Sequence, residues 1–413
     1  MGRSSWYAKW RARWLYVKGC RILRKRARGK APKEWVHEAA RSFEAAIAAD
    51  AGLGEAYKGL ADCKTLLGDL TGAFTAYRQA VDLADNDASF RIFLGNAHAS
   101  LGQYDKALEA YTEALQIDPD CAEAFYNIGC AHTALGRLEE GTRAFLEAIK
   151  RQPVYAEAYN NMGCAYSQLG RHVEALEAYE RAIALKPDLA NAYDGRGHAC
   201  VALGKHAEAA DAFENVLLLT PEDVAAQHNV ASAYLNLGRL DEAAGGYMRV
   251  LFKRGEDKDA RLGLGLVFCR RGQFAEAIEH LQHAEPFAEG RTYVLKCLVD
   301  AYLEEARYVD ALDACEALAR TLKEDSELLG RFGQAFLGLG RYCEAKEVLS
   351  RAIELNADYV EAHRLLGLTC LKTGEIEAAL AEYEVLKALD NDAAHELYAV
   401  IESGESYSEE RKT

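Results

Sequence analysis

The sequence predicts an all-α protein that folds as a solenoid of antiparallel helix pairs. The first observation is a repeat, because AEAFYNIG at residues 122–129 returns as AEAYNNMG at residues 156–163, a shift of 34 residues. The second is that this 34-residue spacing continues from Gly54 to Ala393 without one insertion, which makes ten tandem repeats. The third is composition, since half of the residues are hydrophobic and only 6 are proline. Repeats of this length bury their apolar faces by stacking on their neighbours.

Each repeat is predicted to hold two helices joined by a tight turn. Bulky residues at positions 4, 7 and 11 share one face of the first helix, and a small residue at position 8, such as Gly129, lets a neighbouring backbone come close. Position 15 is glycine in nine repeats and Ala306 in the other, which suits a left-handed residue at a helix end. Positions 20, 24 and 27 form the inner face of the second helix, and a proline at position 32 of four repeats ends it. The ten repeats begin at Gly54, Ala88, Ala122, Ala156, Ala190, Val224, Lys258, Thr292, Ser326 and Val360.

This arrangement resembles the tetratricopeptide repeat (TPR) family, whose 34-residue period and pattern of small, aromatic and proline positions it shares. The resemblance implies a right-handed superhelix whose inner groove is lined by first-helix positions 2, 5, 6, 9, 12 and 13. The chain carries no GxxxxGK[ST], GxSxG or HExxH motif, and the repeats leave no room for a catalytic domain. We therefore expect a binding protein and not an enzyme.

Residues 1–33 differ from everything that follows them. They hold twelve of the 49 Lys and Arg residues, none of the 64 Asp and Glu residues, and three of the four tryptophans. Trp6, Trp10 and Trp14 are spaced so that a helix would align them in one stripe. The sequence therefore predicts a basic, tryptophan-rich arm that makes an interaction of its own. Its cations include Arg11, Arg13, Arg24, Lys25 and Arg26.

Four interpretations of this arm stay open. The tryptophan stripe folds back on the first repeat as a cap, or it lies on an anionic membrane surface or an acidic partner. The two less favoured interpretations are nucleic-acid binding, which we do not expect for the protein as a whole, and an organelle presequence. Its longest apolar run, Trp14–Val17, is far shorter than a membrane-spanning helix.

The two ends of the repeat array are also atypical. Residues 34–53 match only the second half of a repeat, whose first half is replaced by the basic arm, and we interpret them as the N-terminal edge of the solenoid. Residues 394–402 are predicted to form a helix that caps the final apolar face. Residues 403–413 are rich in Ser and Glu, so we expect a disordered tail.

The eleven cysteines include no CxxC pair and fall mostly on core-like helical positions, so we interpret them as small buried hydrophobes in a reducing compartment. That indicates a cytoplasmic protein, with a membrane-peripheral location as the alternative. No metal or other cofactor is expected. His280 and His283 share a helix face but are predicted to lie in solvent.

The predicted groove positions fall into two groups. In the middle repeats they carry neutral amides and histidines, which can pair with the backbone of an extended peptide. These residues are Asn127, Asn160, Asn161, Gln168, Asn191, His198, His228, Asn229 and Asn236. In the later repeats they carry leucines with basic points between them, which suits an amphipathic helix or an acidic segment. The basic residues are Lys296, Arg331, Arg364 and Lys372.

Two residues interrupt these patterns. Gly195 breaks the row of asparagines at position 6, and Arg196 occupies position 7, where neighbouring repeats have apolar residues. A charged group there must snorkel or find a partner, and Asp194 and Asp223 are the nearest candidates in the sequence.

The sequence thus predicts a non-enzymatic scaffold or adaptor that binds peptide segments of partner proteins in the groove. The alternatives are a peripheral membrane assembly factor that acts through the basic arm, and a targeting subunit of an enzyme complex. The sequence does not name the partner, because a repeat groove is general and its ligand is encoded elsewhere.

Overall fold

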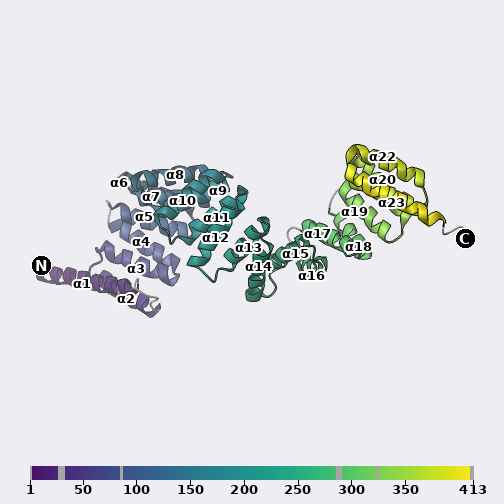
Figure 1. The fold of residues 1–413 in the computed structure, drawn as a ribbon. Helices are drawn as coiled ribbons and strands as arrows, with labels where there is room; N and C mark the ends of the chain where they lie inside the picture. The colour runs from purple at the N-terminus through teal and green to yellow at the C-terminus, as the bar shows by residue number, and fades with distance from the viewer. Residues whose placement is uncertain (1, 27–32, 84–86, 285–290, 322–324, 410–413) are drawn as a thin grey trace. The chain divides into compact units, whose positions relative to one another are not determined.

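The computed structural model describes residues 2–26, 33–83, 87–284, 291–321 and 325–409, and all regular structure in these residues is α-helical. The predicted all-α class is confirmed (Figure 1). The chain divides into two compact parts, here named the N-terminal part (Met1–Thr220) and the C-terminal part (Pro221–Thr413).

The N-terminal part consists of six consecutive helix pairs. Their bounds are α1 Gly2–Arg26, α2 Lys33–Ala49, α3 Gly54–Leu67, α4 Leu70–Leu83, α5 Ala88–Ser100, α6 Tyr104–Ile117, α7 Ala122–Ala134, α8 Leu138–Arg151, α9 Ala156–Gln168, α10 His172–Leu185, α11 Ala190–Ala202 and α12 His206–Leu219.

The C-terminal part continues the same alternation and closes with one more helix. The bounds are α13 Val224–Asn236, α14 Leu240–Arg254, α15 Lys258–Arg270, α16 Phe274–Ala284, α17 Arg291–Glu304, α18 Tyr308–Ala319, α19 Ser326–Gly338, α20 Tyr342–Leu355, α21 Val360–Thr373, α22 Ile376–Leu389 and α23 Asn391–Glu409.

The turn inside each of the ten repeats has the predicted left-handed residue. The nine glycines at position 15 have φ between 69° and 84°, and Ala306 has φ 52°. Because a Cβ is strained in this region and glycine has none, the glycines end the first helix at no steric cost. This expectation is confirmed at all ten positions.

Glycine at position 8 makes room for a ring, where the sequence had suggested a backbone. A Cβ built on Gly129 would lie 2.5 Å from Cε1 of Phe145, the residue at position 24 of the same repeat. Gly163 faces Tyr179 in the same way, at 2.8 Å. The first and second helices of a pair therefore approach closely because an aromatic side chain fills the space above the glycine.

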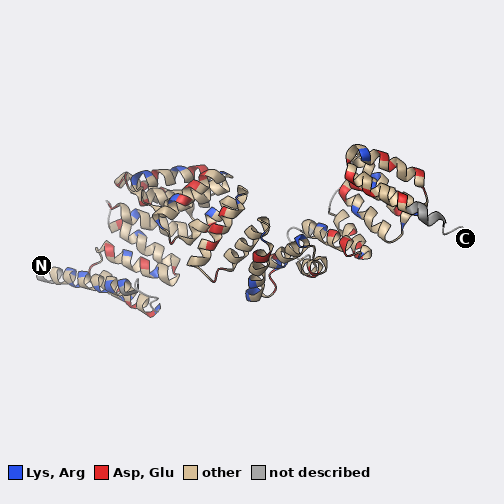
Figure 2. Ribbon diagram, in the orientation of Figure 1, with Lys and Arg blue, Asp and Glu red and all other residues tan. Residues whose placement is uncertain are grey.

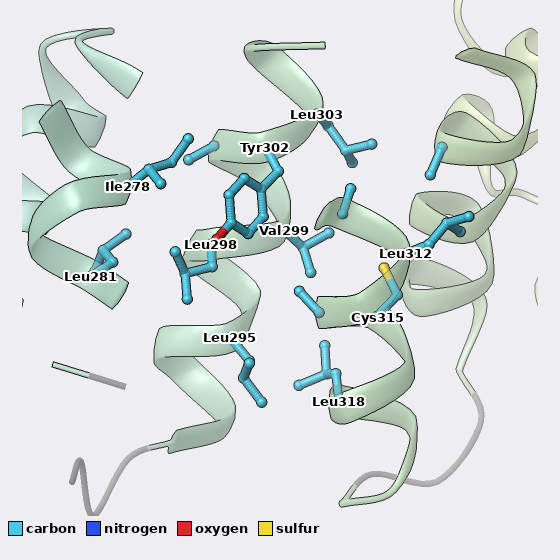
Figure 3. Close-up of a cluster of buried hydrophobic side chains, with 14 of the residues drawn as sticks. Ile278, Leu281, Leu295, Leu298, Val299, Tyr302, Leu303, Leu312, Cys315 and Leu318 are labelled. Atoms are coloured by element: carbon cyan, nitrogen blue, oxygen red, sulfur yellow. The ribbon is translucent and has the colours of Figure 1, made fainter. Parts of the chain in front are cut away.

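The repeat that begins at Thr292 has a larger residue at position 8 and a smaller one at position 24 than the other repeats just described. It has Val299 at position 8 and Cys315 at position 24, and both side chains are fully buried. Figure 3 shows them across from each other between α17 and α18, within a cluster that also holds Leu298, Leu312 and Leu318. A larger residue on the first helix and a smaller one on the second thus fill the same space.

The basic arm supplies a first helix for the N-terminal edge. Tyr16, Ile22 and Leu23 of α1 pack against a buried cluster that holds Phe43 of α2. Gly19 meets the ring of Phe43 as Gly129 meets Phe145, since a Cβ on Gly19 would lie 2.8 Å from it. The half repeat at residues 34–53 is therefore completed by α1 and does not stand alone.

The C-terminal helix is longer than the sequence indicated. α23 runs from Asn391 to Glu409, and Leu397 and Ile401 are buried against α21 and α22. It begins earlier because the Asp390 carboxylate accepts hydrogen bonds from the backbone N–H groups of residues 392 and 393. It also extends into the segment expected to be disordered, of which residues 410–413 lie outside the described residues.

Candidate functional site

The first helices of successive pairs form a continuous surface within each part of the molecule. In the N-terminal part α5 contacts α7, α7 contacts α9, and α9 contacts α11. In the C-terminal part the odd-numbered helices from α13 to α23 contact one another in the same order. The positions predicted to bind a partner all lie on these first helices. The amide and histidine group is divided between α7 to α11 of the N-terminal part and α13 of the C-terminal part, and the basic group lies wholly in the C-terminal part.

A hydrogen-bonded row of amides crosses this surface in the N-terminal part. Asn161 of α9 donates from Nδ2 to the hydroxyl of Tyr126 on α7, at 3.0 Å. Asn160 donates from Nδ2 to Oδ1 of Asn161, at 3.1 Å. Burial raises the pKa of the Tyr126 hydroxyl, so the phenol stays neutral. The side chains of two adjacent repeats are therefore held in one network.

Two buried amide atoms of α7 and α9 have unused hydrogen-bonding capacity. Nδ2 of Asn127 and Oδ1 of Asn160 are buried, and neither has a hydrogen-bond partner among the described residues. Buried amide atoms are usually paired, so each such atom raises the free energy of the unbound protein. The two atoms are one unused donor and one unused acceptor.

Three further predicted residues border this row. Gln168 and Asn191 are exposed at the end of α9 and the start of α11. His198 is also exposed, lies edge-on to Phe213 and approaches the Asp194 carboxylate at 3.6 Å. Residues Asn127, Asn160, Asn161, Gln168 and Asn191 are referred to below as the amide surface.

Neighbouring helices explain both interruptions of the pattern. A Cβ on Gly195 would lie 2.4 Å from the ring of Tyr179 in the preceding repeat, so the ring occupies the place of a position-6 side chain. Arg196 approaches Glu180 of α10, with Nε 3.9 Å from Oε1. The carboxylate that Arg196 approaches is thus neither of the two candidates from the sequence, because position 7 faces the second helix of the preceding pair.

The polar residues predicted on α13 are His228, Asn229 and Asn236. His228 is half-buried against the edge of Tyr247, with ring centroids 5.4 Å apart. Asn229 is half-buried, and Asn236 is exposed at the end of the helix. These residues lie in the C-terminal part, whereas the amide surface lies in the N-terminal part.

Most of the predicted Lys and Arg side chains of the later repeats form ion pairs within the protein. Arg331 donates from Nε to Asp300 at 2.7 Å and from Nη1 to Glu327 at 3.4 Å. Lys296 also approaches Glu327, at 4.0 Å, and Arg364 donates to both oxygens of Glu361, at 2.8 and 2.6 Å. Lys372 is exposed. An acidic ligand would therefore have to displace carboxylates that already hold three of these four cations.

The leucines predicted beside them belong to the interior. Leu303 is 7% exposed within the cluster of Figure 3. Leu337, Leu368 and Leu371 pack half-buried against the cluster that joins α19 to α23. They contribute to packing between repeats, and the later repeats offer less accessible apolar surface than their sequence suggested.

The arm presents its tryptophans to solvent. Trp6, Trp10 and Trp14 are 69%, 53% and 55% exposed. The stripe itself therefore does not fold back on the first repeat, because the opposite face of α1 makes that contact. Arg11, Arg13 and Arg24 are exposed, while the side chains of Lys25 and Arg26 lie outside the described residues.

Family models decide what kind of array this is. One model, described as tetratricopeptide repeat, matches residues 36–88, 195–254, 247–291 and 331–394, which together make up more than half of the chain. Others with TPR descriptions match residues 95–136, 122–155 and 156–189.

The chain belongs to the tetratricopeptide repeat family. The resemblance inferred from its 34-residue period is thereby confirmed. TPR families are generally protein-interaction scaffolds and generally not enzymes, so a scaffold role in the broad sense follows from membership.

Several solved structures resemble this TPR protein. MamA is 30% identical to it, over 40% of this chain and 97% of MamA, with a TM-score of 0.37. PilF of Pseudomonas aeruginosa is 18% identical, over 50% and 95% of the two chains, with a TM-score of 0.45. A chain of the Cut9–Hcn1 hetero-tetramer of the APC/C is 15% identical, over 95% and 96%, also with a TM-score of 0.45. A comparison with curated proteins gave no match.

Membrane-spanning helices and clustered metal ligands do not occur in the described part of this TPR protein. None of the described helices is both long and apolar enough to cross a membrane. The described residues also contain no group of three or more His, Cys, Asp or Glu side chains placed to hold a metal ion.

Sequence reasoning missed the tyrosines of the TPR surface. Tyr126 accepts the amide of Asn161, and Tyr111 donates to Oδ1 of Asn96 at 2.7 Å. Tyr77 donates in the same way to Asp62, at 2.6 Å. The signal was present, because Tyr77 and Tyr111 both occupy position 24 and their partners both occupy position 9. Tyr126 is at position 5, and its pairing with the next repeat has no such regularity.

Proposed function

We propose that this TPR protein is a scaffold or adaptor that holds an extended peptide segment of a partner protein on the amide surface. The observation that carries the proposal is that Asn127 of α7 has an unused donor and Asn160 of α9 has an unused acceptor. A rotation of either side chain would turn its free atom toward a ligand. An extended peptide backbone supplies both a carbonyl acceptor and an N–H donor, so it matches this pair.

The hydrogen bond between Tyr126 and Asn161 lowers the conformational entropy that is lost when a peptide binds. Because Tyr126 fixes Asn161, the Asn161 side chain loses little rotamer freedom when a peptide arrives, whereas Asn127 and Asn160 must rotate to use their free atoms. Backbone-directed amides give affinity without strict demands on the side chains of the ligand. The partner is thus recognised through its extended conformation.

Acidic groups at the edge of the surface favour particular peptides. Glu123 begins α7 on the same face, and Asp194 lies beside His198. Glu157 at the start of α9 is held by Lys186, with Nζ 2.8 Å from Oε1. We propose that the bound segment is neutral or basic, since an acidic one would be repelled.

We propose a cytoplasmic location for this scaffold. None of the eleven cysteines forms a disulfide, and burial raises the pKa of the Cys130, Cys200 and Cys315 thiols, that of Cys315 to about 12. Such thiols are neutral at physiological pH and behave as small apolar groups, which suits a reducing compartment. A membrane-peripheral position is compatible with it.

Selection of displayed peptides tests the site. A library of random peptides of about 12 residues is selected for binding to the full-length protein. Peptides that are enriched should bind the protein with Asn127→Ala, Asn160→Ala and Asn161→Ala at least about tenfold more weakly, because each lost amide bond contributes about 1 kcal/mol. Fluorescence polarisation of a labelled peptide measures this difference. A photocrosslinker placed at the exposed Gln168 should become attached to the same peptide.

The matched control is Gln116→Ala with Asn215→Ala, which removes amides from the second helices α6 and α12. This variant should bind the peptide as the unchanged chain does. Equal affinity in the triple variant, or crosslinking only from second helices, would remove the amide surface as the binding site. Both variants must first give the circular dichroism spectrum of the unchanged chain.

A further inference from the structure

We propose that the outward face of α1 docks on a membrane surface that contains anionic lipids. This inference concerns a separate surface from the amide surface and does not rest on the peptide-binding proposal. The side-chain chemistry and the charge of this face suit a layer of lipid headgroups.

The outward face is an aromatic stripe. Trp6, Trp10 and Trp14 follow one another at intervals of four residues, so they lie along one side of the helix. Tyr7 and Val17 extend the stripe and are 59% and 41% exposed. Tyr7 and Trp10 also stack, with ring centroids 6.2 Å apart. Three indoles more than half in solvent are a large apolar surface to leave uncovered in a folded protein.

The packing of α1 fixes this stripe outward. Ala12 and Gly19 are buried, and Tyr16 lies with its ring 5.9 Å from that of Phe43. These residues are on the side of the helix opposite Trp6, Trp10 and Trp14. Turning the tryptophans inward would expose the contacts that complete the first helix pair. The stripe is therefore held ready for a ligand without any rearrangement.

Cations accompany the stripe and continue beyond it. Arg11, Lys18, Arg21 and Arg24 are exposed, and Lys18 approaches Glu38 only at 4.0 Å. Figure 2 shows the Lys and Arg residues of α1, a helix that contains no Asp or Glu. Not every cation faces outward, since Lys9 and Arg13 line a cavity together with Asp50 and Glu55. The outward cations can meet lipid phosphates while the indoles enter the interface.

This combination fits a membrane better than the other anionic or apolar partners. Two copies that paired stripe to stripe would bring their guanidinium groups together without a compensating carboxylate. Nucleic acid would meet the cations, but single-stranded bases stack in a groove between side chains, whereas these indoles lie along one outward helix face. A headgroup layer uses both components at once, because tryptophan and tyrosine prefer the interface and the cations attract anionic lipids.

The charge of the remaining chain sets the orientation. All 64 Asp and Glu residues come after residue 33, so an anionic surface attracts α1 and repels the repeats that follow. Docking through α1 would thus leave the acidic repeats on the aqueous side of the interface.

Co-sedimentation of the full chain with lipid vesicles tests the proposal. One set contains phosphatidylcholine alone, and the other contains about 30% phosphatidylserine. We expect binding to the anionic vesicles, at least about tenfold weaker binding to the neutral ones, and loss of binding as salt is raised. In a Trp35→Phe background the tryptophan emission reports only the stripe, and it should shift to the blue on binding.

Two variants and their controls assign the binding to this face. The Trp6→Ser, Trp10→Ser, Trp14→Ser variant and the Arg11→Glu, Arg21→Glu variant should each bind anionic vesicles at least about tenfold more weakly. All five side chains are exposed, so circular dichroism should show that both variants remain folded. The aromatic control is Phe252→Ser with Tyr293→Ser, which are 93% and 54% exposed on other helices. The charge control is Lys106→Glu with Arg181→Glu, which are exposed on α6 and α10.

Three results would overturn the proposal. The first is equal binding to neutral and anionic vesicles, or no binding to either. The second is unchanged binding by the tryptophan variant. The third is occupation of the face by another partner. A blue-shifted tryptophan emission without vesicles, together with a dimer in analytical ultracentrifugation, would assign the face to a second copy of the chain. Displacement of the vesicles by a single-stranded RNA would assign it to nucleic acid.

Discussion

Ala306 occupies position 15, the left-handed residue after the first helix, which is glycine in the other nine repeats. It has φ 52°, a left-handed value that the other nine repeats give to glycine. We expect Ala306→Gly to raise the free energy of unfolding by about 1 kcal/mol, because the strained Cβ is removed. The reverse change, Gly136→Ala, should lower it by about the same amount. Urea denaturation measures both, and a loss of stability in Ala306→Gly would contradict the argument.

His363 is the other residue whose environment makes a sharp prediction. Its Nδ1 lies 2.6 Å from the Glu382 carboxylate and its Nε2 lies 2.9 Å from the Ala357 carbonyl oxygen. The carbonyl oxygen can only accept, so Nε2 carries the hydrogen of that bond, and Nδ1 shares the other hydrogen bond with the Glu382 carboxyl group. We expect Glu382→Ala to cost about 1 to 3 kcal/mol of unfolding free energy, because it leaves Nδ1 of a buried ring without its hydrogen-bond partner. The double variant His363→Leu, Glu382→Leu should recover most of the loss, and a cost as large as that of Glu382→Ala would contradict it.

Helix pairing depends on a matched volume between the two helices of a repeat. Gly129→Ala should lower the free energy of unfolding by about 1 to 3 kcal/mol, because the new Cβ would lie against the ring of Phe145. The repeat with Val299 and Cys315 shows how the fold compensates. We therefore expect Gly129→Val combined with Phe145→Cys to be more stable than Gly129→Val alone. Chemical denaturation compares the variants, and a strictly additive pair would show that the two positions do not share one space.

The whole molecule should separate at one point into two folded chains. Residues 1–220 and 221–413 are each compact, so we expect each to fold when produced alone. The sum of their circular dichroism spectra should then reproduce that of the full chain. The control is a break between Gln152 and Pro153, which divides a cluster shared by Phe145 of α8 and Met162 of α9. If the break at residue 220 also caused loss of helix or aggregation, the two parts would not be independent.

Much of the fold could be predicted because the same residue pattern recurs every 34 residues. The helix starts at Ala122, Ala156 and Ala190 coincide with the repeat boundaries, and every position-15 residue is left-handed. The two ends were harder, because they lack neighbours that show the pattern. The chain gave no local sign that α1 would pair with α2 through Gly19, or that α23 would begin at Asn391.

The candidate site was predicted as a set of positions but not as a set of contacts. Asn160 and Asn161 were placed correctly on a first helix, yet their link to Tyr126 depends on how two repeats stack. Arg331 was predicted as a free cation, and it is held by Asp300, 31 residues earlier in the chain.

The sequence by itself determined the family, the all-α class and the geometry of the turns, since these follow from local helix periodicity and from residue types that recur every 34 positions. Only the tertiary structure decided which face of α1 carries the tryptophans outward and that Arg196 approaches Glu180. The physical reason is that such partners come from neighbouring helices. Their distances are set by side-chain packing between repeats, which no spacing along one chain records.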